Sequence, residues 1–241
     1  MILAETATFR KLLALNLGVP LSCAILNHGR PARPDSPVEI SFRPATASDA
    51  PTLRAVFGEE PSDEQLAMAG GDPDRARRFR RLMAGTIAGP SGVSRTTVAV
   101  ADGEIVGFLQ AGAEAGDRVS PALVWGLLRA AGFPGIIGFL RRDRLRGRVH
   151  IAPPPGAFHI AEVHVLGSRR NQGIGAALMA EAERQARAAA APLISLTTTT
   201  SNPARHLYER SGFRVTEERT DPEFEALTGV KGRILMVKDL V

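Results

Sequence analysis

A short basic segment with two glycines contains the residues best placed to bind an anion. The segment is Arg170-Asn171-Gln172-Gly173-Ile174-Gly175, and residues with helical periodicity follow it directly. The first amides of a helix have no partner inside the helix and lie at the positive end of its dipole, where a phosphate can bind. Glycine lets the backbone approach the anion closely, and the arginines at 169 and 170 can add positive charge. The segment therefore predicts a phosphate-binding loop.

Glu162 and His164, just before this loop, could move a proton. They stand two residues apart in Phe158–Val165, a segment with the composition of a strand, so their side chains share one face. A carboxylate can accept a proton, and a histidine titrates near neutral pH. Both are candidate general bases, although a histidine hydrogen-bonded for structural reasons fits position 164 about as well.

The loop is positioned by a strand before it and a helix after it. Ile174, Leu178, Ala182 and Ala186 recur every four residues, which predicts a helix from Ile174 to about Ala189 with one face on a sheet. A dinucleotide-binding loop of the Rossmann type would require a third glycine where Leu178 stands, so that alternative is excluded.

Strand and helix patterns alternate along the rest of the chain. A hairpin is expected around Asp102-Gly103-Glu104, and a helix from Asp72-Pro73 to Gly85. Further strands are predicted at 38–43, 194–199, 213–216 and 233–237, with short helices after Ser48 and from Asn202 to Gly212. This order predicts an α/β fold, in which helices cover a mixed sheet.

Two motifs together resemble the GNAT superfamily of N-acetyltransferases. Val163-His164-Val165 followed by Arg170-x-x-Gly173-x-Gly175 is similar to the family's acetyl-CoA signature. About 30 residues later, Asn202-Pro203-Ala204-Arg205-His206-Leu207-Tyr208-Glu209-Arg210-Ser211-Gly212-Phe213 resembles its second signature. The start of the domain at Ile40–Thr46 is also similar, and the resemblance covers roughly residues 38 to 114 and 158 to 240.

The resemblance implies the GNAT fold, a mostly antiparallel sheet whose fourth and fifth strands splay apart around acetyl-CoA. Backbone groups of Val163 and Val165 would hydrogen-bond the pantetheine arm. Asn202 and Ala204 would contact the cofactor from the far side of the splay, although Asn202 is also an ordinary N-cap residue. The pyrophosphate would be held by the segment Arg170, Asn171, Gln172, Gly173, Ile174, Gly175 and Ala176.

The resemblance also assigns catalytic roles. Tyr208, the only tyrosine in the chain, matches the family tyrosine that protonates the coenzyme A thiolate, and a buried structural aromatic is the alternative. Glu162 is the first choice as base, because family members often carry a glutamate on this strand, and His164 is the second. The implied reaction is direct transfer of acetyl from acetyl-CoA to a primary amine, on a small molecule or on a protein lysine or N-terminus. A non-catalytic acyl-CoA sensor or scaffold with the same fold is the alternative.

Composition indicates what kind of partner, compartment and metal content to expect. The 30 Lys+Arg residues exceed the 25 Asp+Glu, and nearly all are arginines, which suit anionic partners. One cysteine, Cys23, excludes an internal disulfide and fits a reducing compartment, so we expect a cytoplasmic protein. The five histidines show no i, i+4 pair, and no metal is expected.

Two regions fall outside the motifs. Residues 1–37 form a predicted N-terminal extension and linker before the domain at 38–241; their apolar run at 12–26 favours a docked helix over a signal peptide. Residues 115–157 are predicted to be an irregular insertion, and the resemblance to the family implies that it is an acceptor lid or a contact in a homodimer. Its run Arg141–Arg148 could contact a nucleic acid or lie on a membrane surface, but it lacks interleaved aromatics, and neither nucleic-acid binding nor stable membrane insertion is expected.

Overall fold

The computed structural model describes residues 39–58, 61, 63–112 and 133–240. Contacts divide the chain into two units, Met1–Asp35 and Ser36–Val241, and all the described residues belong to the second. The predicted extension at 1–37 and the first part of the predicted insertion, residues 115–132, lie outside the described residues.

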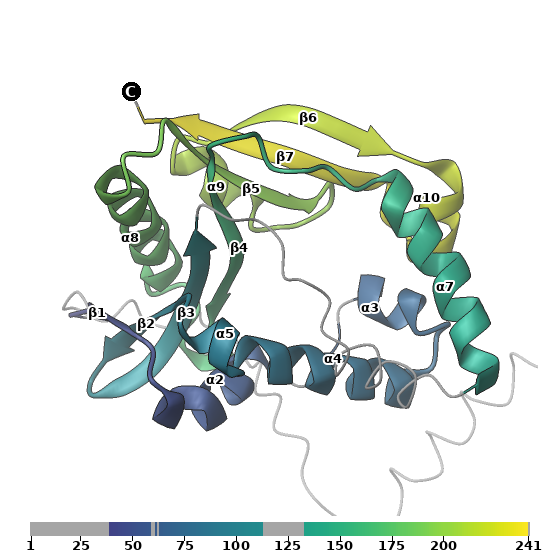
Figure 1. Ribbon diagram of the computed structural model, residues 1–241, viewed down its shortest axis with the longest axis horizontal. Coiled ribbons are helices and arrows are strands. Elements are labelled where there is room, and N and C mark those ends of the chain that lie inside the picture. Colours follow the sequence, from purple (N-terminus) through teal and green to yellow (C-terminus); the bar gives the residue numbers. More distant parts are fainter. Residues whose placement is uncertain (1–38, 59–60, 62, 113–132, 241) are drawn as a thin grey trace, which may run out of the picture. The chain divides into compact units, whose positions relative to one another are not determined.

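A single mixed sheet organises the described part of the chain (Figure 1). Its seven strands follow the order β1-β2-β3-β4-β5-β7-β6, and every neighbouring pair is antiparallel except β4 and β5. The strands are β1 (Ser41–Pro44), β2 (Thr96–Ala101), β3 (Glu104–Gly112), β4 (Phe158–Val165), β5 (Leu193–Thr199), β6 (Arg214–Thr220) and β7 (Gly232–Asp239). The predicted α/β class with a mixed, mostly antiparallel sheet is confirmed.

The parallel pair β4 and β5 separates along its length. Phe158–Ile160 pair with Ile194–Leu196, whereas β4 continues to Val165 paired only with β3. Beyond Ile160 the two strands therefore diverge, and the predicted splay of the fourth and fifth strands is confirmed.

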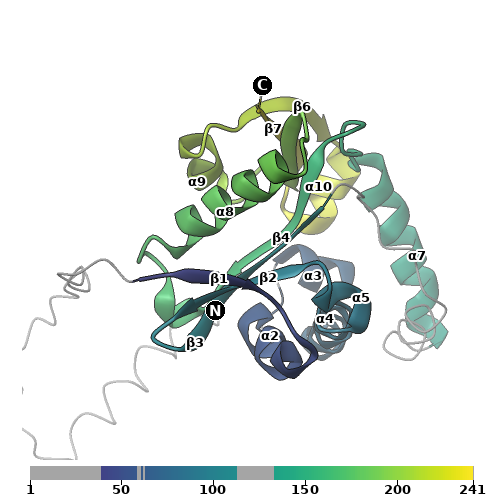
Figure 2. The ribbon, with the colours of Figure 1, turned by 60° about the vertical axis from the view of Figure 1, so that its left-hand side comes forward.

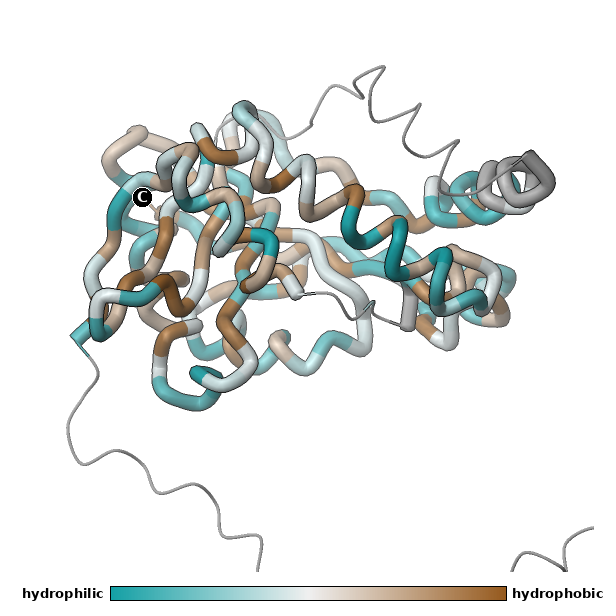
Figure 3. Tube along the Cα trace, turned by 90° about the horizontal axis from the view of Figure 1, so that it is seen from below, coloured by the Kyte–Doolittle hydropathy of each residue, from teal (hydrophilic) through white to brown (hydrophobic). Residues whose placement is uncertain are grey.

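Helices cover both faces of the sheet (Figure 2). One face carries α8 and α9, and the other carries α2, α4 and α5. The bounds are η1 (Ala47–Asp49), α2 (Ala50–Phe57), α3 (Asp63–Met68), α4 (Pro73–Ile87), α5 (Pro90–Val93), α7 (Phe133–Arg148), η2 (Gly167–Arg169), α8 (Ile174–Ala188), α9 (Arg205–Arg210) and α10 (Pro222–Thr228). Hydrophobic and hydrophilic stretches alternate along the tube of Figure 3.

The apolar stripe of α8 closes the larger core. Ile174, Leu178, Ala182 and Ala186 are all buried and pack in one cluster with residues of β3, β4 and β5. This predicted sheet-facing stripe is confirmed, and it fixes the start of α8 beside the end of β4.

Three parts of the element assignment were wrong. The helix after Asp72 continues past Gly85 to Ile87, because Ala84 and Ile87 are still buried against α2 and the sheet. The short helices α3, α5 and α10 were not predicted. Part of the insertion expected to be irregular forms α7, in which Pro134 occupies the first turn, a position that tolerates proline.

The helix α7 packs against other parts of the domain. Leu145 and Val149 contact Phe224 of α10 in a small apolar cluster, and Arg148 pairs with Asp221 at 3.3 Å. Arg142 donates a hydrogen bond from Nε to the carbonyl oxygen of Met68 at 2.8 Å. Part of the predicted basic run thus makes contacts within the domain. Within the described ranges, no helix is both long and apolar enough to cross a bilayer.

Candidate active site

A β-bulge in β4 decides which side chains reach each face of the sheet. Gln110 pairs with Glu162 and Ala111 pairs with Ile160, so Ala161 has no opposite residue on β3. After the bulge, Val163 packs with the α8 cluster as Ile160 does before it. Glu162 and His164 consequently point to the other face, towards α2.

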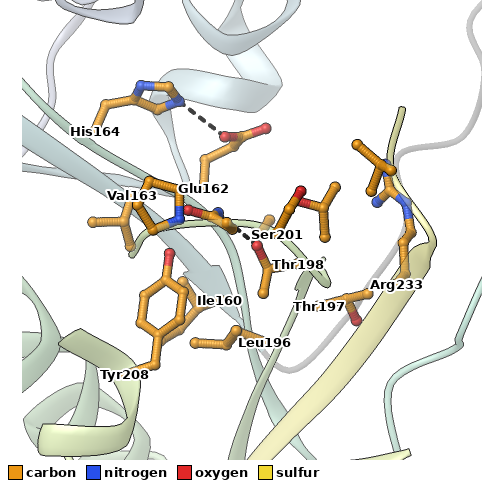
Figure 4. Close-up of a pocket in the computed structure, with 15 residues that line it drawn as sticks. Ile160, Glu162, Val163, His164, Leu196, Thr197, Thr198, Ser201, Tyr208 and Arg233 are labelled. Carbon is orange, nitrogen blue, oxygen red and sulfur yellow. Dashed lines mark hydrogen bonds and ion pairs between the residues drawn. The ribbon is translucent and has the colours of Figure 1, made fainter. Parts of the chain in front are cut away.

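A cavity of about 540 Å³ opens where β4 and β5 separate. Figure 4 shows it between Glu162 and His164 of β4, Thr197 and Thr198 of β5, and Tyr208 of α9. The predicted residues that line it are Glu162, Val163, His164, Asn202 and Tyr208. The splay therefore brings together side chains from both sequence motifs.

Glu162 and His164 form a hydrogen-bonded pair on the wall of this cavity. His164 Nε2 lies 3.0 Å from Glu162 Oε2. The imidazole ring stacks on Phe108 of β3 at 5.1 Å between centroids and contacts the ring of Phe57 of α2 at 4.8 Å. Two aromatic rings thus fix the imidazole so that one nitrogen points at the carboxylate.

Arg80 of α4 contacts the Phe57 ring, which in turn contacts His164. Its guanidinium lies over the Phe57 ring, 4.0 Å from the centroid, and donates to the carbonyl oxygens of Phe57 and Gly58. Burial lowers the pKa of Arg80, and the negative charge of Glu162 acts in the opposite direction. Arg80 is therefore held by partners within the fold rather than by solvent alone.

Tyr208 lies across the cavity from the pair, with its hydroxyl directed towards β4 (Figure 4). Burial raises the pKa of Tyr208, and the negative charge of Glu162 raises it further. The phenol therefore keeps its proton at neutral pH, as a proton donor must.

The backbone of Val163 and Val165 is directed into the splay. Leu166 donates its amide to the carbonyl oxygen of Val106 at 2.9 Å, and antiparallel pairs alternate between bonded and non-bonded positions. By this alternation, residues 162 and 164 bond to β3, whereas the amides and carbonyls of Val163 and Val165 point away from it. They can therefore hydrogen-bond an extended molecule lying between β4 and β5.

The predicted phosphate loop lies between β4 and α8, outside the cavity lining. Asn171 and Gly173 adopt left-handed conformations with φ of 63° and 84°, and Gly173 is the N-cap of α8 without a side-chain cap. A Cβ at Gly175 would lie 3.1 Å from Leu207 Cδ2, so the absence of a side chain lets α9 approach. Arg170, Asn171 and Gln172 belong to the turn before α8, and Ile174 and Ala176 lie in the first turn of that helix.

Two arginines, Arg169 and Arg170, lie beside this loop, and among the described ion pairs only Arg169 has a partner. Arg169 pairs with Asp102 of the β2–β3 turn at 3.3 Å, while Arg170 is exposed. Arg170 is thus the better placed of the two to add charge at the loop.

Asn202 and Ala204 form the turn that leads into α9. Asn202 Oδ1 accepts a hydrogen bond from the Ala204 amide at 2.8 Å, and its Nδ2 donates to Thr198 Oγ1 at 2.6 Å. The helix α9 begins at Arg205, but Asn202 caps the turn before it as an N-cap residue does, since its side chain accepts from Ala204 and its carbonyl oxygen accepts from the Arg205 amide. Asn202 also ties this turn to β5 at the edge of the cavity.

Sequence reasoning missed Phe57 and Phe108, whose rings contact His164, and Arg80, which contacts Phe57. A signal was present for Arg80, since Ala76, Arg80 and Ala84 are spaced by four residues and both alanines are buried. Nothing in the sequence pairs Phe57 or Phe108 with His164, because the three lie on different elements. Among the residues that the structure describes, no three His, Cys, Asp or Glu side chains are grouped as a metal site.

The fold and the two motifs agree with a known family. The model of the acetyltransferase (GNAT) family matches residues 74–213, which is more than half of the chain. The chain therefore belongs to the GNAT acetyltransferase family, as the sequence motifs predicted.

Solved structures share the fold at low sequence identity. The structure of PH1933 from Pyrococcus horikoshii OT3 is 18% identical, with a TM-score of 0.50 over 84% of this chain and 99% of that chain. An apo variant of an agmatine N-acetyltransferase is also 18% identical, with a TM-score of 0.50 over 83% of this chain and 99% of that one. No curated protein matches the sequence. These likenesses concern the fold alone.

Proposed function

We propose that this protein transfers the acetyl group of acetyl-CoA to a primary amine, by direct transfer in a ternary complex. The observation that carries the proposal is the cavity at the β4–β5 splay, where Tyr208 faces the Glu162–His164 pair. A proton donor and a proton acceptor on opposite walls are what aminolysis of a thioester requires.

Acetyl-CoA would bind through backbone groups. The amides of residues 170–176 would hold the pyrophosphate at the start of α8, with charge from Arg170. The amides and carbonyls of Val163 and Val165 would bind the pantetheine arm, and the turn at Asn202 and Ala204 would border it on the β5 side. Residues on the α8 side of the sheet thus supply the donor site.

The chemical step then needs one proton removed and one supplied. The acceptor nitrogen forms its bond to the acetyl carbon while the carbon–sulfur bond breaks. Glu162 accepts the proton released by the nitrogen, and His164 holds this carboxylate in place through the 3.0 Å hydrogen bond. Tyr208 gives its proton to the thiolate sulfur of coenzyme A. Among the described residues that line the cavity there is no cysteine to carry an acyl group, which favours direct transfer.

Tyr208→Phe tests the proposal. Loss of a general acid lowers kcat by about 10²–10⁴-fold, and we expect this loss in acetyl transfer to a pooled panel of primary amines. Phe213→Tyr, which restores a phenol elsewhere, is not expected to recover activity. Acetyl-CoA affinity, measured by calorimetry, should stay within about threefold, because the hydroxyl acts on the leaving group.

The alternative, an acyl-CoA sensor, predicts a different pattern. In that case the wild type binds acetyl-CoA tightly, acetylates no amine in any pool, and Tyr208→Phe changes nothing. The proposal also includes a cytoplasmic location, in keeping with the single cysteine of the chain.

A further inference from the structure

A second cavity, of about 470 Å³, lies beside the first, on the face of the sheet opposite α8. Ala161 lines both cavities, and Gln110 of the second pairs with Glu162 of the first across β3 and β4. The side chains of such a cross-strand pair lie on one face, with Cβ atoms about 5 Å apart. A molecule whose amine lies beside Glu162 can therefore extend past Ala161 into the second cavity.

The side chain of Gln110 is held in one orientation where it lines this cavity. Its Nε2 donates to Thr96 Oγ1 at 2.8 Å and to the carbonyl oxygens of Ile87 and Gly92, each at 3.3 Å. The residue is only 8% exposed, yet no donor in the described part of the chain reaches its Oε1. An acceptor left unpaired inside a protein costs free energy, and a donor group of a ligand would satisfy it.

His159 supplies a hydrogen-bond donor in the same cavity. Its Nδ1 lies 2.9 Å from Oγ of Ser195, a fully buried residue whose hydroxyl has no other partner in the described ranges. A buried hydroxyl donates its proton where an acceptor is available, so Ser195 donates to Nδ1. Burial lowers the pKa of His159 to about 4, which keeps the ring neutral, and its single N–H is then at Nε2. This N–H can donate to a ligand in the cavity.

Gln110 and His159 lie close together across an open space. Gly112 pairs with His159 across β3 and β4, and Gln110 stands two residues before Gly112 on the same face. A Cβ at Gly112 would meet no atom within 4 Å, so the space beside His159 is open. The cavity thus presents one acceptor, Gln110 Oε1, and one donor, His159 Nε2, to the same ligand.

The unpartnered groups of this cavity are neutral. Thr197, which lines both cavities, has a hydroxyl oxygen without a partner among the described residues. Arg95, Arg146 and Arg233 also line the second cavity, but each of them has a partner within the chain. The lining therefore favours an uncharged polar ligand over an anion.

We infer that the second cavity binds an uncharged polar group of the acceptor that both donates and accepts a hydrogen bond, as a carboxamide or a hydroxyl does. This inference rests on the proposed acetyl transfer at the first cavity. The amine of the acceptor would lie beside Glu162, its N–H or O–H would donate to Gln110 Oε1, and its oxygen would accept from His159 Nε2. Gln110 and His159 are then specificity-determining residues for the acceptor.

Four acceptors of equal length test the inference with the full chain. An ω-amino carboxamide, the amino alcohol, the amino carboxylate and the plain alkylamine are compared by kcat/KM. We expect at least one neutral polar amine to exceed the alkylamine by about tenfold or more, and the better of the two identifies carboxamide or hydroxyl. The carboxylate should not share this advantage, because it has no proton to donate to Gln110 Oε1.

Gln110→Met and His159→Leu should each lower the ratio of kcat/KM between the polar amine and the alkylamine about fivefold. This ratio does not depend on the amount of folded enzyme, since both substrates are measured with one preparation. His159→Gln, which keeps a donor, should retain part of the preference. His206→Leu, at an exposed position, and Gln185→Met, which removes hydrogen bonds within the chain at α8, are the matched controls and should leave the ratio unchanged.

Three results would overturn the inference while leaving acetyl transfer intact: equal kcat/KM values for all four acceptors, a preference for the carboxylate, or a polar preference that survives both cavity variants. If no amine is acetylated, the proposed function fails. The inference is then judged by titrating the amino carboxamide and the amino alcohol into the coenzyme A complex. Binding of either that Gln110→Met weakens about fivefold supports the site, whereas binding that is absent or unaffected by this variant contradicts it.

Discussion

The two faces of the sheet differ in how their residues are spread along the sequence. The α8 face uses consecutive residues, whereas the face under α2, α4 and α5 combines separate elements. On the α8 face, the strand, the loop and the helix that form the candidate donor site follow each other in residues 158–188. On the other face, His164 contacts the rings of Phe57 and Phe108, and Arg80 contacts Phe57, so the three residues come from three elements. A local motif can therefore identify the donor, whereas the acceptor side depends on tertiary packing.

This difference between the two faces suggests that one face binds the acetyl donor and the other recognises the acceptor. The α8 face offers mainly backbone groups, which suit a donor whose pyrophosphate and pantetheine arm are the same in every reaction. The other face offers charged side chains, since Glu162 and Arg233 both line the cavity at the splay. Specificity for the acceptor should therefore be changed by substitutions on the second face alone.

Glu162→Gln should have the largest effect on the acceptor side. Removal of a general base lowers kcat/KM by about 10²–10⁴-fold, and the limb of the pH profile that reports the base should disappear. Acetyl-CoA affinity should be unchanged, as the contrast between the faces requires. Glu218→Gln, an exposed residue of β6, is the matched control. A small effect of Glu162→Gln beside a large effect of His164→Gln would show that the histidine is the base.

His159 of β4 should make the stability of the protein depend on pH. Burial lowers its pKa from 6.5 to about 4, so the folded state favours the neutral ring. Because the folded pKa is depressed, this contribution to stability is fully present above pH 6.5 and is lost as the pH falls towards 4. The loss amounts to about 2–3 kcal/mol for a shift of this size.

Chemical denaturation at several pH values checks this dependence, with His159→Gln as the comparison. The variant should lose less unfolding free energy between pH 7 and pH 4 than the wild type does. His206→Gln, at an exposed position, should behave as the wild type does. Parallel curves for wild type and His159→Gln would contradict the assignment of a buried neutral ring.

Arg80→Gln should have a smaller effect, on kinetics rather than on donor binding. The loss of its hydrogen bonds to α2 frees the Phe57 ring that contacts His164, and one such bond contributes about 1 kcal/mol. We expect a fall in kcat of about fivefold with a displaced pH profile, and partial rescue by Arg80→Lys. Arg78→Gln on the exposed side of α4 should change neither quantity. A loss of acetyl-CoA affinity instead would contradict a role confined to the acceptor face.

The sequence supports detailed prediction where local patterns are strong. The four-residue spacing from Ile174 to Ala186 and the strand at Phe158–Val165 both appear as expected. The bulge at Ala161 could not be predicted, because it depends on register with β3, and it directs Glu162 and His164 to the face under α2. The contacts of Arg80 could not be predicted either, because a long charged side chain can cover apolar surface while its head group finds partners inside the fold.

The central claim is that acetyl-CoA binds at the splay, along β4 and the loop before α8. Amide hydrogen exchange with and without acetyl-CoA tests it most directly, since bound amides exchange more slowly. The account predicts strong protection confined to the segment from Val163 to Ala176, with little change in α2 and α4. Protection centred on α2 or α4, with the amides of residues 170–176 unaffected, would contradict it.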